Sequence, residues 1–252
     1  MLRIRGLSVG YGGEPILDGI DLDVHPGQFV SLIGPSGSGK TSILRIITNL
    51  LPSQRGTVEI EIPPGDIGIL FQDDALLPWR TARQNVALGL RIRGAPRAAA
   101  EEQADYWLAS LGMSGFATRY PRQLSGGQRK RVALAQVLAL EPRLLLMDEP
   151  FASLDAIVRM RVTEELLGWV ERKQMTVLLV THDLEEAISL SDVVYVLSQG
   201  PRATVRARHA VNIARPRHVL ESRGHAAFAP LLQRLWSDLA DAPAGDPGEP
   251  AP

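Results

Sequence analysis

The chain has 252 residues, of which 45% are hydrophobic and 22% charged, and its formal net charge is −1. This is the composition of an ordinary soluble protein that can bury a full core, as one large domain or two unequal ones. The near-zero charge supplies no overall positive field, so we expect no nucleic-acid partner, and the absence of cysteine excludes disulfides and thiolate metal sites.

The N-terminal part of the chain is predicted to form strands. Residues 2–9 and 16–24 alternate apolar and polar side chains on either side of a Gly-Gly turn at 12–13, which is typical of antiparallel strands. The apolar run at 29–33 predicts a buried strand, and the spacing at 42–47 predicts a helix. Two further strands are expected at 57–62 and 67–71.

A phosphate-binding loop is predicted between the strand at 29–33 and the helix at 42–47. Residues 34–41 read Gly-Pro-Ser-Gly-Ser-Gly-Lys-Thr. In this pattern backbone N–H groups wrap a polyphosphate, Lys40 reaches the β- and γ-phosphates, and the Thr41 hydroxyl binds Mg²⁺. A bare glycine-rich turn is the alternative, but the flanking strand and helix disfavour it. We expect nucleotide contacts from Gly34, Pro35, Ser36, Gly37, Ser38, Gly39, Lys40, Thr41 and Ser42.

The rest of the chain indicates a sheet interrupted by helices. Residues 82–140 contain no convincing strand and are predicted to be a helical insertion. Strands expected at 144–147, 176–180 and 193–197 alternate with helices near 156–172 and 184–190, the pattern of a parallel α/β sheet. We therefore expect a discontinuous core, 1–81 with 141–239, and a helical subdomain at 82–140. The Pro/Gly-rich stretch 240–252 predicts a disordered tail.

Two carboxylates directly follow the strand expected at 144–147. They lie at the carboxyl end of that strand, where open α/β sheets bind ligands. Asp148 would hold Mg²⁺, through water, and Glu149 could accept a proton from an attacking water molecule. The alternative is an exposed acidic turn before Pro150.

A second glycine turn precedes a helix in the middle of the chain. Residues 124–128 read Leu-Ser-Gly-Gly-Gln, so Ser125 is a natural N-cap, and Gly126 and Gly127 leave backbone N–H groups accessible to an anion. A glycine turn that only caps a helix is the common alternative.

The ordered set of motifs resembles the ATP-binding-cassette (ABC) ATPases, with Walker A at 34–41, the signature at 124–128 and Walker B ending at Asp148. The resemblance covers most of the chain. It implies an α/β fold, a P-loop NTPase (RecA-like) core with an N-terminal antiparallel β subdomain and an inserted α-helical subdomain. It also implies ATP and Mg²⁺ as cofactors.

Four more positions match family motifs. Tyr11 matches the aromatic residue that stacks on adenine, and Gln72 the Q-loop glutamine near Mg²⁺ and the water. His182 matches the switch histidine that contacts the γ-phosphate, and Asp155 ends the D-loop, 153–155. The simpler alternatives are a strand-end aromatic for Tyr11, a solvated cap for Gln72 and a structural role for His182.

The resemblance also implies partners. In the family the signature faces a nucleotide on the other subunit, so Ser125, Gly127 and Gln128 are expected to contact ATP across a head-to-tail dimer. Leu77-Pro-Trp79 and residues 85–90 resemble the nitrate/sulfonate/taurine importer group, where this surface receives a helix of the permease. A packed loop is the alternative.

The implied function is the ATP-hydrolysing subunit of a bacterial importer for a small oxyanion such as an aliphatic sulfonate, taurine or nitrate. It would sit peripherally on the cytoplasmic face of the inner membrane, with permease subunits and an extracytoplasmic substrate-binding protein. Alternatives are an ABC exporter subunit, a soluble ABC ATPase acting on DNA or the ribosome, and a P-loop kinase. The stretch 203–213, with Arg206 and Arg208 on one face, is expected to be a solvated edge strand.

Overall fold

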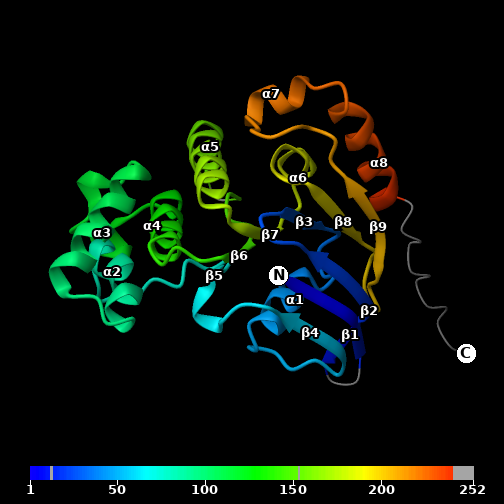
Figure 1. The fold of residues 1–252 in the computed structure, drawn as a ribbon, viewed down its shortest axis with the longest axis horizontal. Coiled ribbons are helices and arrows are strands. Elements are labelled where there is room, and N and C mark those ends of the chain that lie inside the picture. The colour runs from blue at the N-terminus through cyan, green and yellow to red at the C-terminus, as the bar shows by residue number, and fades with distance from the viewer. Residues whose placement is uncertain (12–13, 153, 241–252) are drawn as a thin grey trace, which may run out of the picture.

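The computed structural model describes residues 1–11, 14–152 and 154–240. Figure 1 shows two sheets at the centre, helices α2, α3 and α4 gathered at one end, α7 next to α5 and α6, and α8 beside strands β8 and β9. The fold is therefore an α/β core with a helical lobe, as the motifs implied.

The smaller sheet is antiparallel and holds β1 (Leu2–Tyr11), β2 (Glu14–Val24) and β4 (Arg55–Ile60) in the order β2-β1-β4. The buried residues of β1 and β2 alternate with exposed or partly exposed ones except at one irregularity in each strand, between Ile4 and Leu7 and between Leu17 and Ile20, so the predicted antiparallel strands are confirmed. The strand expected at 57–62 begins two residues earlier. The Gly-Gly turn at 12–13 lies outside the described residues.

The larger sheet has the strand order β5-β6-β7-β3-β8-β9. Neighbouring strands are parallel from β5 to β8, and β9 is antiparallel to β8. Strands β3, β6, β7 and β8 are buried along their whole length, which explains why they are continuous apolar runs. The strands are β3 (Phe29–Ile33), β5 (Ile67–Leu70), β6 (Leu144–Asp148), β7 (Thr176–Val180), β8 (Val193–Leu197) and β9 (Val205–Ala210).

Three helices pack against the larger sheet: α1 (Lys40–Ile47), α5 (Ala156–Lys173) and α6 (Leu184–Leu190). The helical lobe contains α2 (Ala82–Ile92), α3 (Arg97–Ser110) and α4 (Gly126–Leu138), with short 3-10 helices at Ser114–Phe116 and Pro121–Gln123, and another at Pro64–Asp66 before β5. One buried cluster joins lobe and sheet, and within it the rings of Trp107 on α3 and Trp169 on α5 lie 4.7 Å apart. The division into core and helical subdomain stays a proposal.

The C-terminal part contains two helices that the sequence analysis did not predict, α7 (Val219–Gly224) and α8 (Phe228–Ala240). Phe228, Leu231 and Leu235 of α8 pack into a cluster with residues of α6 and β8. Ala240 belongs to α8, so the tail predicted from 240 is wrong at its first residue, and residues 241–252 lie outside the described part.

Strand β9 is the edge of the larger sheet, as expected for 203–213. Arg206 and Arg208 lie on its exposed face, and the Arg208 guanidinium lies 5.8 Å from the centre of the Tyr195 ring. Within the described residues, no helix combines the length and the apolar character that a membrane span requires.

Candidate functional site

The parallel sheet brings four separate chain segments to one edge. Strands β5, β6, β7 and β3 are neighbours in that order and run in the same direction, so their carboxyl ends lie side by side. Gln72 follows β5, Asp148 ends β6, His182 follows β7 and Gly34 follows β3. In register, Asp148 is paired with Val180, and Val180 with Leu32. Residues far apart in the sequence thereby become neighbours.

A cavity of about 570 Å³ lies at this edge. Its walls contain Ser36, Gly37, Gly39, Lys40, Thr41, Ser42, Gln72, Asp148, Glu149 and His182, together with Ile16 of β2, which the sequence analysis did not single out. Lys40, Thr41, Gln72, Asp148, Glu149 and His182, which come from separate segments and are expected to handle phosphate, metal and water, therefore meet at one place within a single chain. Gly34, Pro35 and Ser36 also line an adjoining cavity with His182.

Lys40 and Gly39 stabilise the compact conformation of the phosphate loop. Lys40 Nζ donates to the carbonyl oxygens of Gly34 at 2.8 Å and Pro35 at 2.7 Å. Gly39 has φ +85°, and a Cβ there would come within 2.6 Å of Leu17 Cδ2 on β2, so only glycine fits. Burial lowers the pKa of Lys40, while Glu149 and Asp148 raise it. The Lys40 ammonium group has three hydrogen-bond donors and little contact with solvent, which suits it to bind a polyphosphate.

Asp148 and Thr41 both present oxygen atoms to this cavity. The exposed fraction of Asp148 is 2%, whereas Thr41 is partly exposed. Burial raises the pKa of Asp148, the hydrogen bond with Thr41 lowers it, and Glu149 raises it. Such hard oxygens are the ligands that Mg²⁺ prefers, and the ion usually completes its shell with phosphates and water. No cluster of three acidic or histidine side chains suited to a metal occurs among the described residues, so the pair would share the ion with the nucleotide.

Glu149 and His182 are in direct contact at the wall of the cavity. His182 Nδ1 lies 3.2 Å from Glu149 Oε1, and 66% of the His182 side chain is exposed, so both groups can reach a bound ligand. Glu149 has φ +46°, and its N–H donates to the Val180 carbonyl at 2.9 Å. The hydrogen bond to β7 fixes the carboxylate beside His182 in this left-handed backbone conformation.

Ser125, Gln128 and Asp155 belong to helix caps that do not line this cavity. Ser125 caps α4: its Oγ accepts from Gln128 N at 3.2 Å, and Gln128 Oε1 accepts from Ser125 N at 2.9 Å. Asp155 caps α5, accepting from Val158 N at 3.0 Å. Ser38 is buried beneath the loop, and Tyr11 ends β1. Ser125, Gly127, Gln128 and Asp155 do not line the 570 Å³ cavity, so any contact with ATP would come from a second subunit.

Lys130 on α4 is a buried residue that the sequence analysis missed. Its Nζ donates to the carbonyl oxygens of Phe71 at 2.8 Å and Gln72 at 2.7 Å, and burial lowers its pKa, while the carboxylates led by Asp74 raise it. The helix that starts at the signature therefore holds the backbone of Gln72. A signal was present, because Lys130 shares a helical face with the buried Ala133 and Leu134.

We expect Lys130→Met to destabilise the protein by about 1–3 kcal/mol, because it leaves two backbone carbonyls without a buried donor. Turnover of ATP should fall more than ATP affinity, since Gln72 loses its anchor while the phosphate loop is untouched. Lys173→Met is the control: its ion pair with Glu141 is exposed, and its loss should cost no more than about 0.5 kcal/mol. Thermal unfolding and steady-state turnover measure both, and equal behaviour of the two variants would contradict the role of Lys130.

Comparison with known proteins identifies close relatives. The family model described as ABC transporter matches residues 17–152. The taurine import ATP-binding protein TauB of Escherichia coli O157:H7 is 42% identical over 220 residues, covering 85% of this chain and 86% of the relative. The aliphatic sulfonates import ATP-binding protein SsuB 2 of Rhodococcus jostii strain RHA1 is 40% identical over 242 residues, covering 95% and 94%.

Solved structures with a similar fold are also ABC transporter cassettes. The dimeric structure of MJ0796, a bacterial ABC transporter cassette, matches with a TM-score of 0.77 and 30% identity over 85% of this chain and 100% of that chain. A post-hydrolysis state of the same cassette, bound to ADP and Pi, matches with a TM-score of 0.76 and 31% identity over the same shares. Together with the motifs in their spatial order, these matches show that the chain belongs to the ABC transporter family of ATP-binding cassettes.

Proposed function

We propose that this chain is the ATP-hydrolysing subunit of an importer for small sulfonates, of which taurine and aliphatic sulfonates are the leading candidates. The observation that carries the proposal is the cavity where the phosphate loop, Asp148, Glu149, Gln72 and His182 meet, in a chain about 40% identical to two sulfonate-importer subunits. Nitrate is the less favoured cargo, because the relatives named above carry sulfonates.

Each residue of the cavity has a task in hydrolysis. The backbone N–H groups of the loop and Lys40 would hold the phosphates, and Thr41 and Asp148, with Gln72, would hold Mg²⁺, which would supply positive charge against the phosphates. Glu149 accepts a proton from the attacking water, and His182 contacts the γ-phosphate beside it. The 3.2 Å contact between these two side chains supports a shared action on one water and one phosphoryl group.

The active unit is proposed to be a head-to-tail dimer. The N-terminus of α4 carries Ser125, Gly127 and Gln128 and lies outside the chain's own cavity. The capping box uses the N–H groups of Ser125 and Gln128, which leaves those of Gly126 and Gly127 for an anion. A second copy that turns this helix end toward the γ-phosphate would complete the site, since helix N-termini favour anions. Tyr11 and Asp155 are proposed to contact the nucleotide and the dimer interface. Hydrolysis removes the bridging γ-phosphate and releases the subunits.

The loop at Leu77-Pro78-Trp79 is proposed to receive the permease. The exposed fraction of Trp79 is 70%, an unusual state for the largest apolar side chain. Asn85, fully buried on α2, holds the loop from behind: its Oδ1 accepts from Leu77 N at 2.8 Å, and its Nδ2 donates to the carbonyls of Leu77, Arg80 and Thr81 at 3.0–3.2 Å. An aromatic anchor on a rigid support is suited to docking a partner helix.

We expect Trp79→Ala to leave the ATPase activity of the isolated subunit nearly unchanged and to lower transport, or permease binding, by about tenfold or more, because a central aromatic anchor is lost. Asn85→Ala should have the same effect by releasing the loop. Tyr106→Ala is the control, since Tyr106 is another exposed aromatic of the helical lobe, on α3. Reconstitution in vesicles measures transport, and unimpaired transport by Trp79→Ala would reject the docking role.

The transported solute and the location of the subunit in the cell follow from the same proposal. The subunit would sit peripherally on the cytoplasmic face of the inner membrane, where its permease passes solute from an extracytoplasmic substrate-binding protein. Calorimetry of the cognate binding protein with taurine, an alkanesulfonate and nitrate decides the cargo. A binding protein that holds a sugar, a peptide or a metal ion would reject the sulfonate assignment and leave the ATPase intact.

A further inference from the structure

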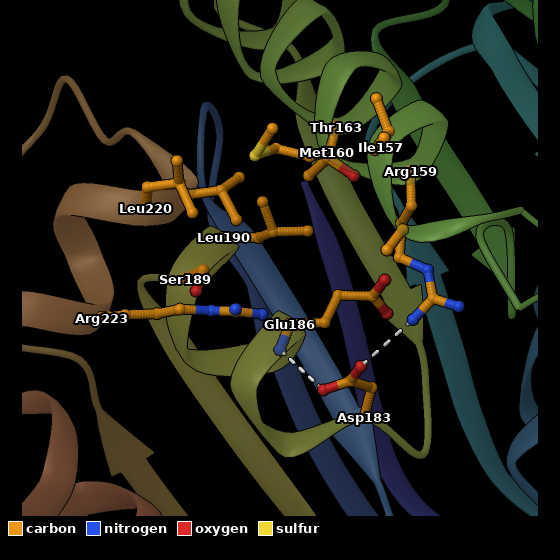
Figure 2. Close-up of a pocket in the computed structure, with 12 residues that line it drawn as sticks. Ile157, Arg159, Met160, Thr163, Asp183, Glu186, Ser189, Leu190, Leu220 and Arg223 are labelled. Carbon is orange, nitrogen blue, oxygen red and sulfur yellow. Dashed lines mark hydrogen bonds and ion pairs between the residues drawn. The ribbon is translucent and has the colours of Figure 1, made fainter.

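A second cavity, of about 300 Å³, lies between α5, α6 and α7 and is separate from the nucleotide cavity. Figure 2 shows side chains from the three helices pointing into it, with Glu186 near the centre and Asp183 joined to Arg159 below it. Its apolar wall contains Ala156, Ile157, Met160, Leu190, Val219 and Leu220. Ile157 and Leu220 are 71% and 59% exposed, so the cavity opens to solvent between them.

The Glu186 carboxyl group is poorly compensated. Of the cations that face it, Arg159 of α5 pairs with Asp183 at 3.7 Å, and Arg223 of α7 pairs with Glu185 at 3.0 Å. Within the described residues Glu186 has no ion pair of its own. Burial is the largest cause that raises its pKa and Asp183 raises it further, while Thr181, Arg159 and His182 lower it, and the net pKa is about 7.

Two polar atoms of the cavity wall, Ser189 Oγ and Arg159 Nε, are buried and have no hydrogen-bond partner among the described residues. Ser189 is fully buried, and among the described residues nothing hydrogen-bonds to its Oγ. Buried hydroxyl groups are nearly always hydrogen-bonded, so an unpaired one at the wall of a cavity indicates a missing ligand atom. Glu186 and Ser189 are one helical turn apart on α6 and both line the same cavity. Together they present acceptor oxygens at one end of an apolar space.

We propose that this cavity binds small primary aliphatic ammonium ions, with the ammonium on Glu186 and Ser189 and the carbon chain against Met160, Leu190 and Leu220. An ammonium has three donors and no acceptor, which matches two acceptor groups in need of donors. A carboxylate of the same length would place its charge against Glu186, and the two guanidinium groups of the wall, Arg159 and Arg223, are already paired with Asp183 and Glu185. The fit explains why an apolar pocket carries one uncompensated carboxyl group.

The cavity is placed to influence the nucleotide site. Helix α5 begins after Asp155, and α6 begins after Asp183, the neighbour of His182. The ion pair of Arg159 with Asp183 joins the first turns of these two helices. A ligand that contacts both helices restrains their relative position, and with it the backbone next to His182.

The test is calorimetric titration of the full chain with n-butylammonium chloride, with sodium butyrate and n-butanol as matched probes. A ligand of so few heavy atoms should bind in the millimolar range. We expect saturable binding of the ammonium, and affinities weaker by about tenfold or more for the other two probes. Glu186→Gln should weaken ammonium binding by about tenfold or more, while Glu185→Gln, the neighbouring carboxylate paired with Arg223, should not. No saturable binding by the wild type would mean that the cavity holds water only and would overturn the proposal.

A pH series on the wild type tests the same proposal without a variant. Butylammonium stays charged while Glu186 ionises near pH 7, so the affinity should rise as pH increases through about 7. A flat profile, or equal affinity of Glu186→Gln, contradicts the role of Glu186. The variant is expected to fold, because removing a buried charge should raise the thermal midpoint above pH 7.

Discussion

Glu149→Gln should keep ATP affinity and lower ATP turnover by about 10²-fold or more, since an amide cannot accept the proton of the attacking water. Lys40, Thr41 and Asp148 remain in place, so the phosphates and the metal keep their ligands. Glutamine has the same shape, and the hydrogen bond of the residue 149 N–H to Val180 is a backbone contact, so the loop geometry is unaffected. The bound nucleotide then persists between two subunits.

Three measurements check this expectation. Steady-state turnover should drop, equilibrium nucleotide binding should hold, and size-exclusion chromatography with ATP and Mg²⁺ should show a dimer that the wild type forms only transiently. Glu141→Gln is the matched control, because Glu141 is an exposed carboxylate whose partner is Lys173. A variant that stays monomeric at all protein concentrations, or that retains near-normal turnover, would reject Glu149 as the base.

Ser125→Arg and Lys40→Ala should each abolish hydrolysis when every subunit carries the same change, for different reasons. The arginine blocks closure of the signature onto the nucleotide of the other subunit, while ATP still binds the open monomer through the phosphate loop. Loss of Lys40 removes the cation on the β- and γ-phosphates of its own nucleotide. In a mixed dimer one composite site has both an intact phosphate loop and an intact signature, so mixing the two inactive proteins should restore activity.

The capping role of Ser125 must be separated from its role at the nucleotide. Ser125→Ala removes the side-chain cap of α4 and should cost about 1 kcal/mol of stability, without the bulk of arginine. Ser125→Thr keeps the hydroxyl cap. Ser125→Ala removes both the cap and the hydroxyl proposed to contact ATP, so its stability reports the cap alone and the mixed dimers report the action in trans. If mixed subunits stay inactive, the action in trans loses its support.

Much of this protein could be predicted from local patterns. The phosphate loop is contiguous from Gly34 to Thr41, because one strand, one turn and one helix suffice to make an anion-binding helix end. Strands β3, β6, β7 and β8 of the larger sheet could be predicted equally well, since they are buried along their whole length and are therefore unbroken apolar runs. Helix α7 has only six residues and gives little periodic signal, whereas α8 carries Phe228, Leu231 and Leu235 at helical spacing, a local signal that the sequence analysis did not use.

The chemistry of each segment could be read from its own residues: a phosphate loop, an acidic strand end, a capped glycine turn and a histidine after a strand. The sequence did not show which of these segments lie together in the folded protein, because the adjacency of β5, β6, β7 and β3 is set by sheet pairing and not by chain order. Buried contacts such as Lys130 on the carbonyl of Gln72, and cavities such as the one beside Glu186, arise where helices from separate segments pack. Burial and the loss of solvent at such places shift the pKa of a side chain that the sequence alone presents as an ordinary surface residue.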